Sequence, residues 1–276
     1  MNISDIPAYC ITIDKTRKDR AIISAENIKK LGFKTFEFVD GVIGNNLSDD
    51  EIKKILTPRA YYETIIDKKR YSHETLSGLP SIGCSISHIN LWKKCVANNQ
   101  IIAIFEDDIM NILSPDVINK VYHDALAHNF DILKFTYFGN MSPIKQKITP
   151  NLVKLTLEYS CGAYIITPKC AEILLKYAYP IDTHIDQYIN FVAMIYKLNI
   201  YGTPQNSIIW TNPKVSTINH DNLTLHPDFV QIFNAKEPFS SEDKCRTKNN
   251  YIIFLLLLFI FSIFVVMYLN CINNIS

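Results

Sequence analysis

Three consecutive acidic residues, Glu106, Asp107 and Asp108, follow directly after an apolar run and carry side chains suited to chemistry. Alternate side chains of an extended segment face the same way, so Glu106 and Asp108 should project together while Asp107 points elsewhere. Two carboxylates on one side offer hard oxygen ligands to Mg²⁺ or Mn²⁺, and such an ion in turn bridges phosphates. The spacing predicts a metal site at Glu106 and Asp108; a solvated acidic turn is the alternative.

Further polar residues follow two short apolar segments near the start of the chain. Arg17 and Arg20 come after the first segment and offer paired planar donors to a phosphate; a solvated basic turn is the alternative. Asp40 ends the second segment before Gly41, and we expect it either to bind a nucleoside or to form a turn. Asp107 is expected either to contact a ribose or to cap the turn that follows it.

The elements that position these residues begin with a βαβ unit. Residues 9–13 are rich in β-formers, residues 21–31 carry apolar side chains at helical spacing, and residues 34–39 alternate as a second strand. Units of this kind bind nucleotides at the carboxyl ends of their strands. The position of Arg17, Arg20 and the strand-ending Asp40 therefore agrees with a nucleotide site.

The rest of the chain up to about residue 243 reads as one α/β domain. A polar, Tyr-rich stretch over residues 59–79 lacks a clear period and is predicted to be a loop that is either mobile or facing substrate. The other predicted elements are a helix from the capping box Ser48–Glu51 to Leu56, a helix over residues 83–97, a strand over 101–105, a capped helix after Thr167 and a final strand at 208–210.

Composition limits the classes of protein and of site. The 276 residues suffice for one large core, and 28 basic residues nearly balance 27 acidic ones, which argues against a nucleic-acid partner. The seven cysteines are scattered and never form a CxxC pair, so spacing supports neither a disulfide framework nor a zinc site. We expect buried or idle thiols in a reducing compartment.

The C-terminal region differs in kind from the rest. Residues 251–269 carry no charge, and as a helix they would span roughly 28 Å, close to the thickness of a bilayer's hydrocarbon core. Residues 244–250 are a basic linker and residues 270–276 an uncharged tail, so the positive side should be cytoplasmic. With no secretory signal visible at the start, we expect a single-pass, tail-anchored membrane protein with its catalytic domain, residues 1–243, in the cytosol.

Three segments together resemble the core signature of glycosyltransferase family 25. They are residues 81–88 (SIGCSISH), residues 91–94 (LWKK) and residues 103–108 (AIFEDD), with weaker matches between about residues 7 and 210. The resemblance implies a GT-A-like fold, a nucleotide-binding α/β sandwich that uses a divalent metal. Two departures are Thr12, where the family commonly has Asn, and Ser81, which stands where Glu is frequent.

The resemblance also implies an activity and assigns residues to it. The expected reaction moves a hexose, galactose or glucose, from a UDP-sugar to a hydroxyl of a glycan, a lipid-linked saccharide or a protein, with Mn²⁺ preferred over Mg²⁺. Inversion at the anomeric carbon needs a base for the acceptor hydroxyl. Asp186 is the preferred base and Asp182 the second candidate, with helix capping as the alternative for either.

Two other functions are compatible with these residues. One is a glycosyltransferase-like pseudoenzyme that binds nucleotide or glycan without turnover; the other is a tail-anchored adaptor, which would show no metal-dependent nucleotide binding. His88 lies one helical turn after Cys84 and one before Trp92. We expect it to be packed and hydrogen-bonded, without acid–base work.

Overall fold

The computed structural model describes residues 2–70, 75–109, 114–136, 146–156, 159–204 and 224–225. These all belong to one compact unit, Met1–His226. Within the described ranges no helix is both long enough and apolar enough to cross a bilayer. The predicted anchor at 251–269, the linker at 244–250, the tail at 270–276 and the predicted strand at 208–210 lie outside the described residues.

A mixed eight-stranded sheet forms the centre of the described unit, in the order β2-β1-β4-β8-β5-β9-β7-β6. Strands β2, β1 and β4 run parallel, β8 runs antiparallel to β4 and β5, and β5 and β9 are parallel. The strands are β1 Ala8–Thr12, β2 Phe36–Asp40, β4 Ile102–Glu106, β5 Ile132–Lys134, β6 Gln146–Lys147, β7 Val153–Lys154, β8 Ala163–Ile166 and β9 Ile200–Gly202.

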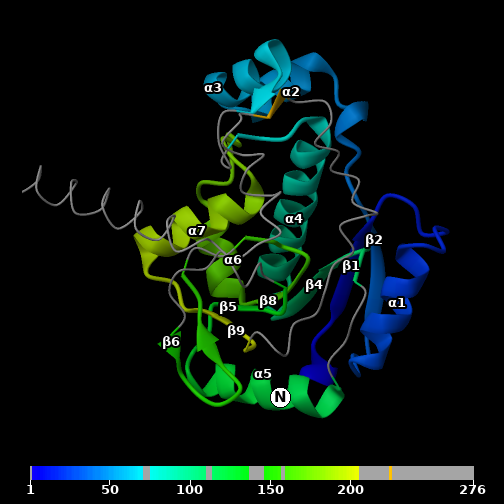
Figure 1. The fold of residues 1–276 in the computed structure, drawn as a ribbon, viewed down its shortest axis with the longest axis vertical. Helices are drawn as coiled ribbons and strands as arrows, with labels where there is room; N and C mark the ends of the chain where they lie inside the picture. The colour runs from blue at the N-terminus through cyan, green and yellow to red at the C-terminus, as the bar shows by residue number, and fades with distance from the viewer. Residues whose placement is uncertain are drawn as a thin grey trace, which may run out of the picture. The chain divides into compact units, whose positions relative to one another are not determined.

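Helices cover both faces of this sheet (Figure 1). On one face, α1 (Ala21–Lys30) and α5 (Pro115–Ala127) pack against side chains such as Ala8 and Phe105. On the other, α4 (Leu79–Ala97), α6 (Pro168–Leu175) and α7 (Ile185–Tyr196) pack against side chains such as Ile104 and Tyr164. These five helices, packed on the two faces of one sheet, confirm the predicted α/β sandwich.

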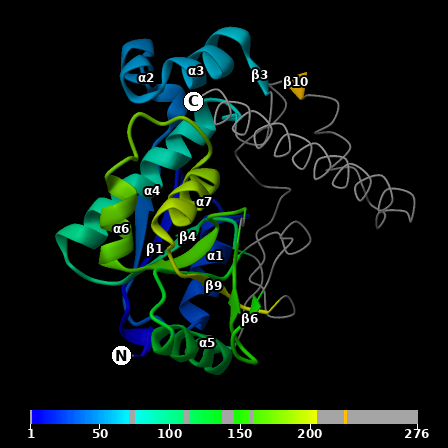
Figure 2. The ribbon, with the colours of Figure 1, turned by 90° about the vertical axis from the view of Figure 1, so that its left-hand side faces the viewer.

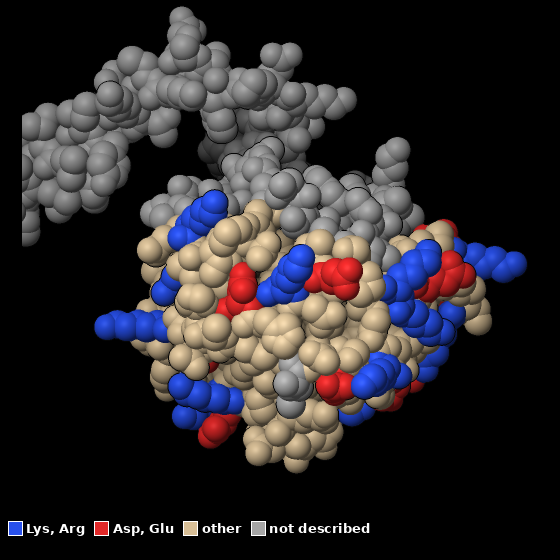
Figure 3. Space-filling model, turned by 90° about the horizontal axis from the view of Figure 1, so that it is seen from below, with Lys and Arg blue, Asp and Glu red and all other residues tan. Residues whose placement is uncertain are grey.

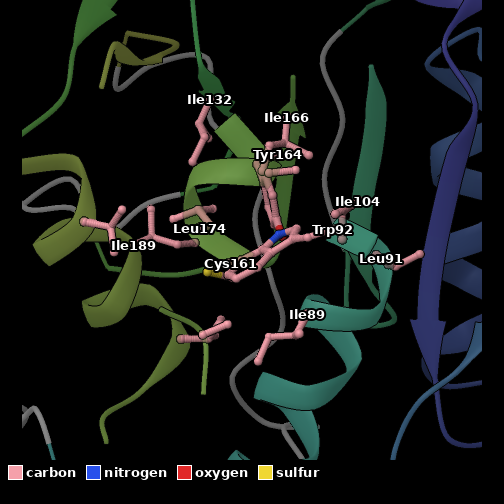
Figure 4. Close-up of a cluster of buried hydrophobic side chains, with 14 of the residues drawn as sticks. Ile89, Leu91, Trp92, Ile104, Ile132, Cys161, Tyr164, Ile166, Leu174 and Ile189 are labelled. Atoms are coloured by element: carbon pink, nitrogen blue, oxygen red, sulfur yellow. The ribbon is translucent and has the colours of Figure 1, made fainter. Parts of the chain in front are cut away.

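The core beneath α4 is organised around Trp92 (Figure 4). Its side chain is fully buried and packs between the sheet and the helices α6 and α7, near Leu174 and Ile189. The indole Nε1–H donates to the hydroxyl of Tyr164 at 2.9 Å, so this large side chain is buried without an unpaired donor. Helix α4 is therefore held firmly against β8, which matters because α4 also carries site residues.

The predicted βαβ unit is confirmed. Strands β1 and β2 pair in parallel from Ala8 opposite Phe36 to Thr12 opposite Asp40, and α1 forms the connection. The predicted helices after Ser48 and Thr167 are also confirmed, as α2 (Asp49–Ile55) and α6, each with its cap residue accepting a backbone hydrogen bond. Strand β4 ends at Glu106, one residue later than predicted.

The loop prediction over residues 59–79 was wrong for much of its length. Thr57 accepts a hydrogen bond from Ala60 N and Pro58 occupies the first turn, so a cap starts α3 (Pro58–Tyr61), which runs on into the π-helical segment η3 (Tyr62–Asp67). Strand β3 (Lys69–Arg70) then pairs in parallel with β10 (Thr224–Leu225). Helices α2 and α3 lie together at the end of the unit opposite α5 (Figures 1 and 2).

Charges are mixed on the face of the molecule that includes α5. Among the coloured residues in Figure 3, Lys and Arg side chains alternate with Asp and Glu side chains, and neither sign forms a continuous area. Short 3-10 turns, η1 (Ile3–Asp5) and η2 (Gly44–Asn46), complete the described elements. Among the described residues, this face therefore carries no extended area of one charge.

Candidate functional site

A pocket of about 210 Å³ opens at the carboxyl ends of the parallel strands β1 and β4. In open α/β sheets this is the edge at which ligands bind, because loops diverge there and leave a crevice. The acidic triplet forms one part of its wall, and the turn after β2 and the first half of α4 form another. The lining residues are 11–13, 41–45 and 106–108, together with Arg20, Pro80, Cys84, Ser87 and His88.

Two glycines let α4 approach the turn after β2. A Cβ on Gly83 would lie 2.2 Å from the backbone oxygen of Val42, and one on Gly44 would lie 1.8 Å from that of Leu79. Backbone atoms cannot yield as the end of a side chain can, so larger residues would push the helix and the turn apart. Gly44 and Gly83 thereby place Cys84, in the first half of α4, at the pocket wall.

Asp107 is held by two partners and lies almost fully buried. Arg20, at the start of α1, donates from Nη2 to Asp107 Oδ1, and both side chains are about 5% exposed. Thr12 Oγ1 at the end of β1 donates to Asp107 Oδ2 at 2.6 Å. Both carboxylate oxygens are thus engaged within the protein, and Thr12, the departure from the family pattern, supplies one of the donors.

Asp108 is 8% exposed, and within the described part of the chain its buried Oδ1 has no hydrogen-bond partner. Burial and, next, the charge of Glu106 raise the pKa of Asp108 from 3.8 to about 7, while Arg20 opposes the shift. A buried carboxylate oxygen without a donor is energetically unfavourable unless something satisfies it. A cation in the pocket would do so and would restore the ionised form.

Glu106 contacts the end of a hydrogen-bonded chain of side chains. Trp92 donates to the Tyr164 oxygen, and Tyr164 lies 2.9 Å from His88 Nδ1. His88 Nε2 in turn lies 3.4 Å from Glu106 Oε1. Because the Trp92 donor occupies an acceptor site of Tyr164, the Tyr164 proton is directed to Nδ1, and a neutral His88 carries its proton on Nε2, facing Glu106. His88 is fully buried and hydrogen-bonded, as the sequence predicted.

The sequence analysis did not predict that Cys84 and His88 lie close to Glu106. Cys84, His88 and Glu106 offer ligand atoms that all lie within 4.8 Å of one another. Burial and, next, the charge of Glu106 raise the pKa of the Cys84 thiol well above its ordinary value. The available signal was the spacing of Cys84 and His88, four residues apart and thus on one face of a helix.

Two predicted nucleotide contacts lie outside the pocket lining. Arg17 forms an ion pair with Asp19, and Asp40 forms one with Lys15 at 2.8 Å, in exposed or half-exposed positions. Their neighbours, Arg20 and the turn after Asp40, do line the pocket. The structure therefore brings together Arg20, Glu106, Asp107 and Asp108 of the predicted set, and leaves Arg17 and Asp40 at its margin.

The two candidate bases occupy different surroundings. Asp186, in the first turn of α7, accepts hydrogen bonds from the backbone N–H groups of Ser160 (3.0 Å) and Gln187 (2.8 Å). Ser160 has a left-handed backbone, φ 92°, uncommon for a residue with a side chain and typical of functional segments. Two residues on, Gly162 O accepts from Glu106 N at 2.8 Å, which connects the Asp186 region to the acidic triplet.

Asp182 instead connects the segment before α7 to the start of α3. Thr57 and Arg59, at the start of α3, both donate to its carboxylate, with Arg59 Nη2 at 2.5 Å from Oδ2. Burial acts to raise the pKa of Asp182, but these hydrogen bonds outweigh it and hold the pKa below its usual value. Neither Asp182 nor Asp186 is among the residues that line the pocket.

Comparison with known proteins matches residues 5–189 to the family described as "Glycosyltransferase family 25 (LPS biosynthesis protein)". A protein of Haemophilus influenzae named "Putative glycosyltransferase" is 33% identical over 176 residues, which cover 61% of this chain and 56% of that protein. The "Procollagen lysyl hydroxylase and glycosyltransferase" of Acanthamoeba polyphaga mimivirus is 27% identical over 135 residues, 44% of this chain and 14% of that protein. The chain thus matches little more than half of the first relative and a small part of the second.

Solved structures share only a limited likeness with this fold. An apo UDP-glucose pyrophosphorylase aligns over 75% of this chain and 92% of its own, with 10% identity and a TM-score of 0.39. A 4-diphosphocytidyl-2C-methyl-D-erythritol synthase from Anaerococcus prevotii aligns over 76% and 92%, with 8% identity and a TM-score of 0.36. TM-scores below 0.5 are too low to establish a shared fold.

Proposed function

We propose that this chain, which belongs to glycosyltransferase family 25, transfers a hexose from a UDP-sugar bound with a divalent cation in the pocket at the ends of β1 and β4. The observation that carries the proposal is the buried Oδ1 of Asp108, which has no hydrogen-bond partner among the residues that the structure describes. It lies beside Glu106 in the pocket, within the residues matched to the family. An acidic pocket repels a diphosphate unless a cation lies between them. The donor set therefore fits a metal-dependent transferase better than a metal-free one.

Glu106 and Asp108 are the residues that would hold the cation, with Mn²⁺ preferred over Mg²⁺. When bound, the cation would neutralise the charge that develops on the departing diphosphate. Asp107 is assigned a different task, because its two oxygens are taken up by Arg20 and Thr12. That buried ion pair fixes the turn after β4 and so holds its two neighbouring carboxylates in place.

The acceptor hydroxyl needs a base if the transfer inverts the anomeric carbon. We assign this task to Asp186, because the segment from Ser160 to Gly162 links its carboxylate to the backbone of Glu106. Asp182 is the weaker candidate, since Thr57 and Arg59 already bind its oxygens and hold it in its ionised form. In this arrangement Asp186 takes the proton while the sugar–oxygen bond forms.

Galactose or glucose is the proposed sugar, and the acceptor is a hydroxyl of a glycan, a lipid-linked saccharide or a protein. The uncharged run at residues 251–269 supports a membrane tether, with the pocket on the cytosolic side. A tether of this kind favours an acceptor at or near a membrane.

The proposal is tested with the full-length chain in detergent, a panel of UDP-sugars and Mn²⁺. We expect slow hydrolysis of one donor, dependent on Mn²⁺ and reduced at least a hundredfold in Asp108→Asn. Asp116→Asn is the matched control, because Asp116 is an exposed carboxylate on α5. Turnover that needs no metal, or that survives Asp108→Asn, would contradict the assignment.

The same experiment separates the alternatives that the sequence left open. Binding of UDP that needs Mn²⁺, without turnover of any donor or acceptor, would identify a glycosyltransferase-like pseudoenzyme. The absence of any Mn²⁺-dependent UDP binding would favour a non-enzymatic adaptor. Asp186→Asn then tests the base: we expect loss of transfer to acceptor with UDP binding unchanged.

A further inference from the structure

A thiol, an imidazole and a carboxylate meet at the wall of the pocket. Cys84 and His88 lie one turn apart on α4, and Glu106 ends the adjacent strand β4. Their ligand atoms all lie within 4.8 Å of one another, and all three residues line the pocket. This combination differs from the oxygen-only pair of Glu106 and Asp108, because sulfur and nitrogen ligands select borderline metals such as Zn²⁺.

The distance between two of the ligand atoms matches that of a tetrahedral zinc site. Nitrogen and oxygen ligands at about 2.0–2.1 Å from Zn²⁺ lie about 3.3 Å apart at the tetrahedral angle. His88 Nε2 and Glu106 Oε1 are 3.4 Å apart, so this edge is already formed. A sulfur ligand requires about 3.6 Å to its neighbours, and Cys84 Sγ lies within 4.8 Å of both other ligand atoms, so it must approach them by at most about 1.2 Å.

His88 also has the support that zinc-bound imidazoles typically have. Its Nδ1 lies 2.9 Å from the hydroxyl of Tyr164, which Trp92 and the surrounding core hold in place. When Nε2 binds a metal, the His88 proton moves to Nδ1 and the hydrogen bond to Tyr164 reverses. Nδ1–H then donates to the hydroxyl oxygen, which also accepts from Trp92, and the Tyr164 proton turns away from His88. Three protein ligands at a pocket wall leave the fourth position open to the pocket, for water or a phosphate oxygen.

We propose that Cys84, His88 and Glu106 form a Zn²⁺ site, and that Zn²⁺ bound there excludes the catalytic metal because both ions need Glu106. Binding releases the Cys84 thiol proton to solvent, and His88 changes tautomer so that its proton lies on Nδ1 and is hydrogen-bonded to the Tyr164 oxygen. The first part stands on these three side chains alone. The second part, zinc as an inhibitor, rests on the proposed function.

Co²⁺ is the probe for the first part, because a cobalt–thiolate bond gives a charge-transfer band in the near ultraviolet. We expect the full-length, metal-free chain to show this band when one equivalent of Co²⁺ is added. Subsequent addition of Zn²⁺ should abolish the band. Cys84→Ser should remove the band and His88→Gln should weaken binding at least tenfold. Cys161→Ser is the matched control, because this neighbouring buried thiol is not part of the group.

Asp108→Asn distinguishes the two metal sites, because Asp108 is not a ligand of the proposed zinc site. This variant should keep the cobalt–thiolate band and lose Mn²⁺ binding, which the electron paramagnetic resonance of free Mn²⁺ measures. In the wild type, one equivalent of Zn²⁺ should release bound Mn²⁺, and in Cys84→Ser it should not. If the wild-type protein shows the cobalt–thiolate band but binds no Mn²⁺, the result would support the zinc site and contradict the proposed catalytic metal.

Three results would overturn the zinc site. They are a wild-type spectrum without a thiolate band, a band that persists in Cys84→Ser, and a band that Asp108→Asn removes. The wild-type spectrum decides even where a variant fails to fold, and circular dichroism checks the fold of each variant. Zn²⁺ that binds without releasing Mn²⁺ would refute the inhibitory part alone.

Discussion

Asp108→Asn is expected to stabilise the metal-free protein at alkaline pH. Asp108 is 8% exposed, its Oδ1 lacks a partner within the described residues, and burial together with the charge of Glu106 disfavours its ionised form. Asparagine has nearly the same shape and carries no charge. The substitution therefore removes an unfavourable charge while leaving the packing of the turn unchanged.

The magnitude follows from the shift in pKa. The pKa of Asp108 is about 7 in the folded protein and 3.8 in the unfolded chain, and each unit corresponds to about 1.4 kcal/mol. Between these two values the folded state binds more protons, so this group makes the protein less stable as pH rises, until the effect levels off above pH 7. Relative to wild type, Asp108→Asn should raise the free energy of unfolding by up to about 4 kcal/mol at pH 8 and by about 2 kcal/mol at pH 5.

Urea unfolding of the full-length chain in detergent, with metals chelated, measures this gain at both pH values. Asp116→Asn on α5 is the control, and its effect should be small and similar at pH 5 and pH 8. An Asp108→Asn variant that is less stable than wild type at pH 8, or a gain that is the same at both pH values, would refute the reasoning. Saturating Mn²⁺ should reverse the order of stability, because only the wild type keeps both carboxylate ligands.

Three further outcomes are expected. Mn²⁺ affinity of the wild type should rise with pH up to about 7 and then level off, because the cation binds the ionised form of Asp108; isothermal titration calorimetry measures this. Arg20→Gln should destabilise the protein by about 3–5 kcal/mol, because it leaves Asp107 as a buried, unpaired charge, whereas Arg17→Gln on the surface should change stability by less than about 1 kcal/mol; thermal unfolding compares them. Gly83→Ala should displace α4 and weaken UDP binding, because its methyl group would meet backbone atoms at 2.2 Å; a binding titration and a crystal structure test this.

Local patterns predicted much of the fold because they reflect local physics. Helical periodicity, caps at Ser48 and Thr167, and short apolar runs indicate elements whose hydrogen bonds lie within a few residues, and the structure contains those elements. Two elements between residues 57 and 70 were not predicted, for different reasons. The Thr57–Pro58 cap is a local signal of the same type as Thr167–Pro168, and only the lack of a clear hydrophobic period after it led to the prediction of a loop. The pairing of residues 69–70 with residues 224–225 depends on a contact distant in the chain.

By itself, the sequence determined that an acidic triplet ends a buried strand of an α/β domain, since both statements depend on neighbouring residues. Only the tertiary structure decided what each carboxylate contacts. Asp107 turns to Thr12, 95 residues away, and Glu106 meets His88 on a separate helix, while Asp108 is left buried beside them. Partners so distant in the chain are brought together by packing of the whole core, which no spacing rule encodes.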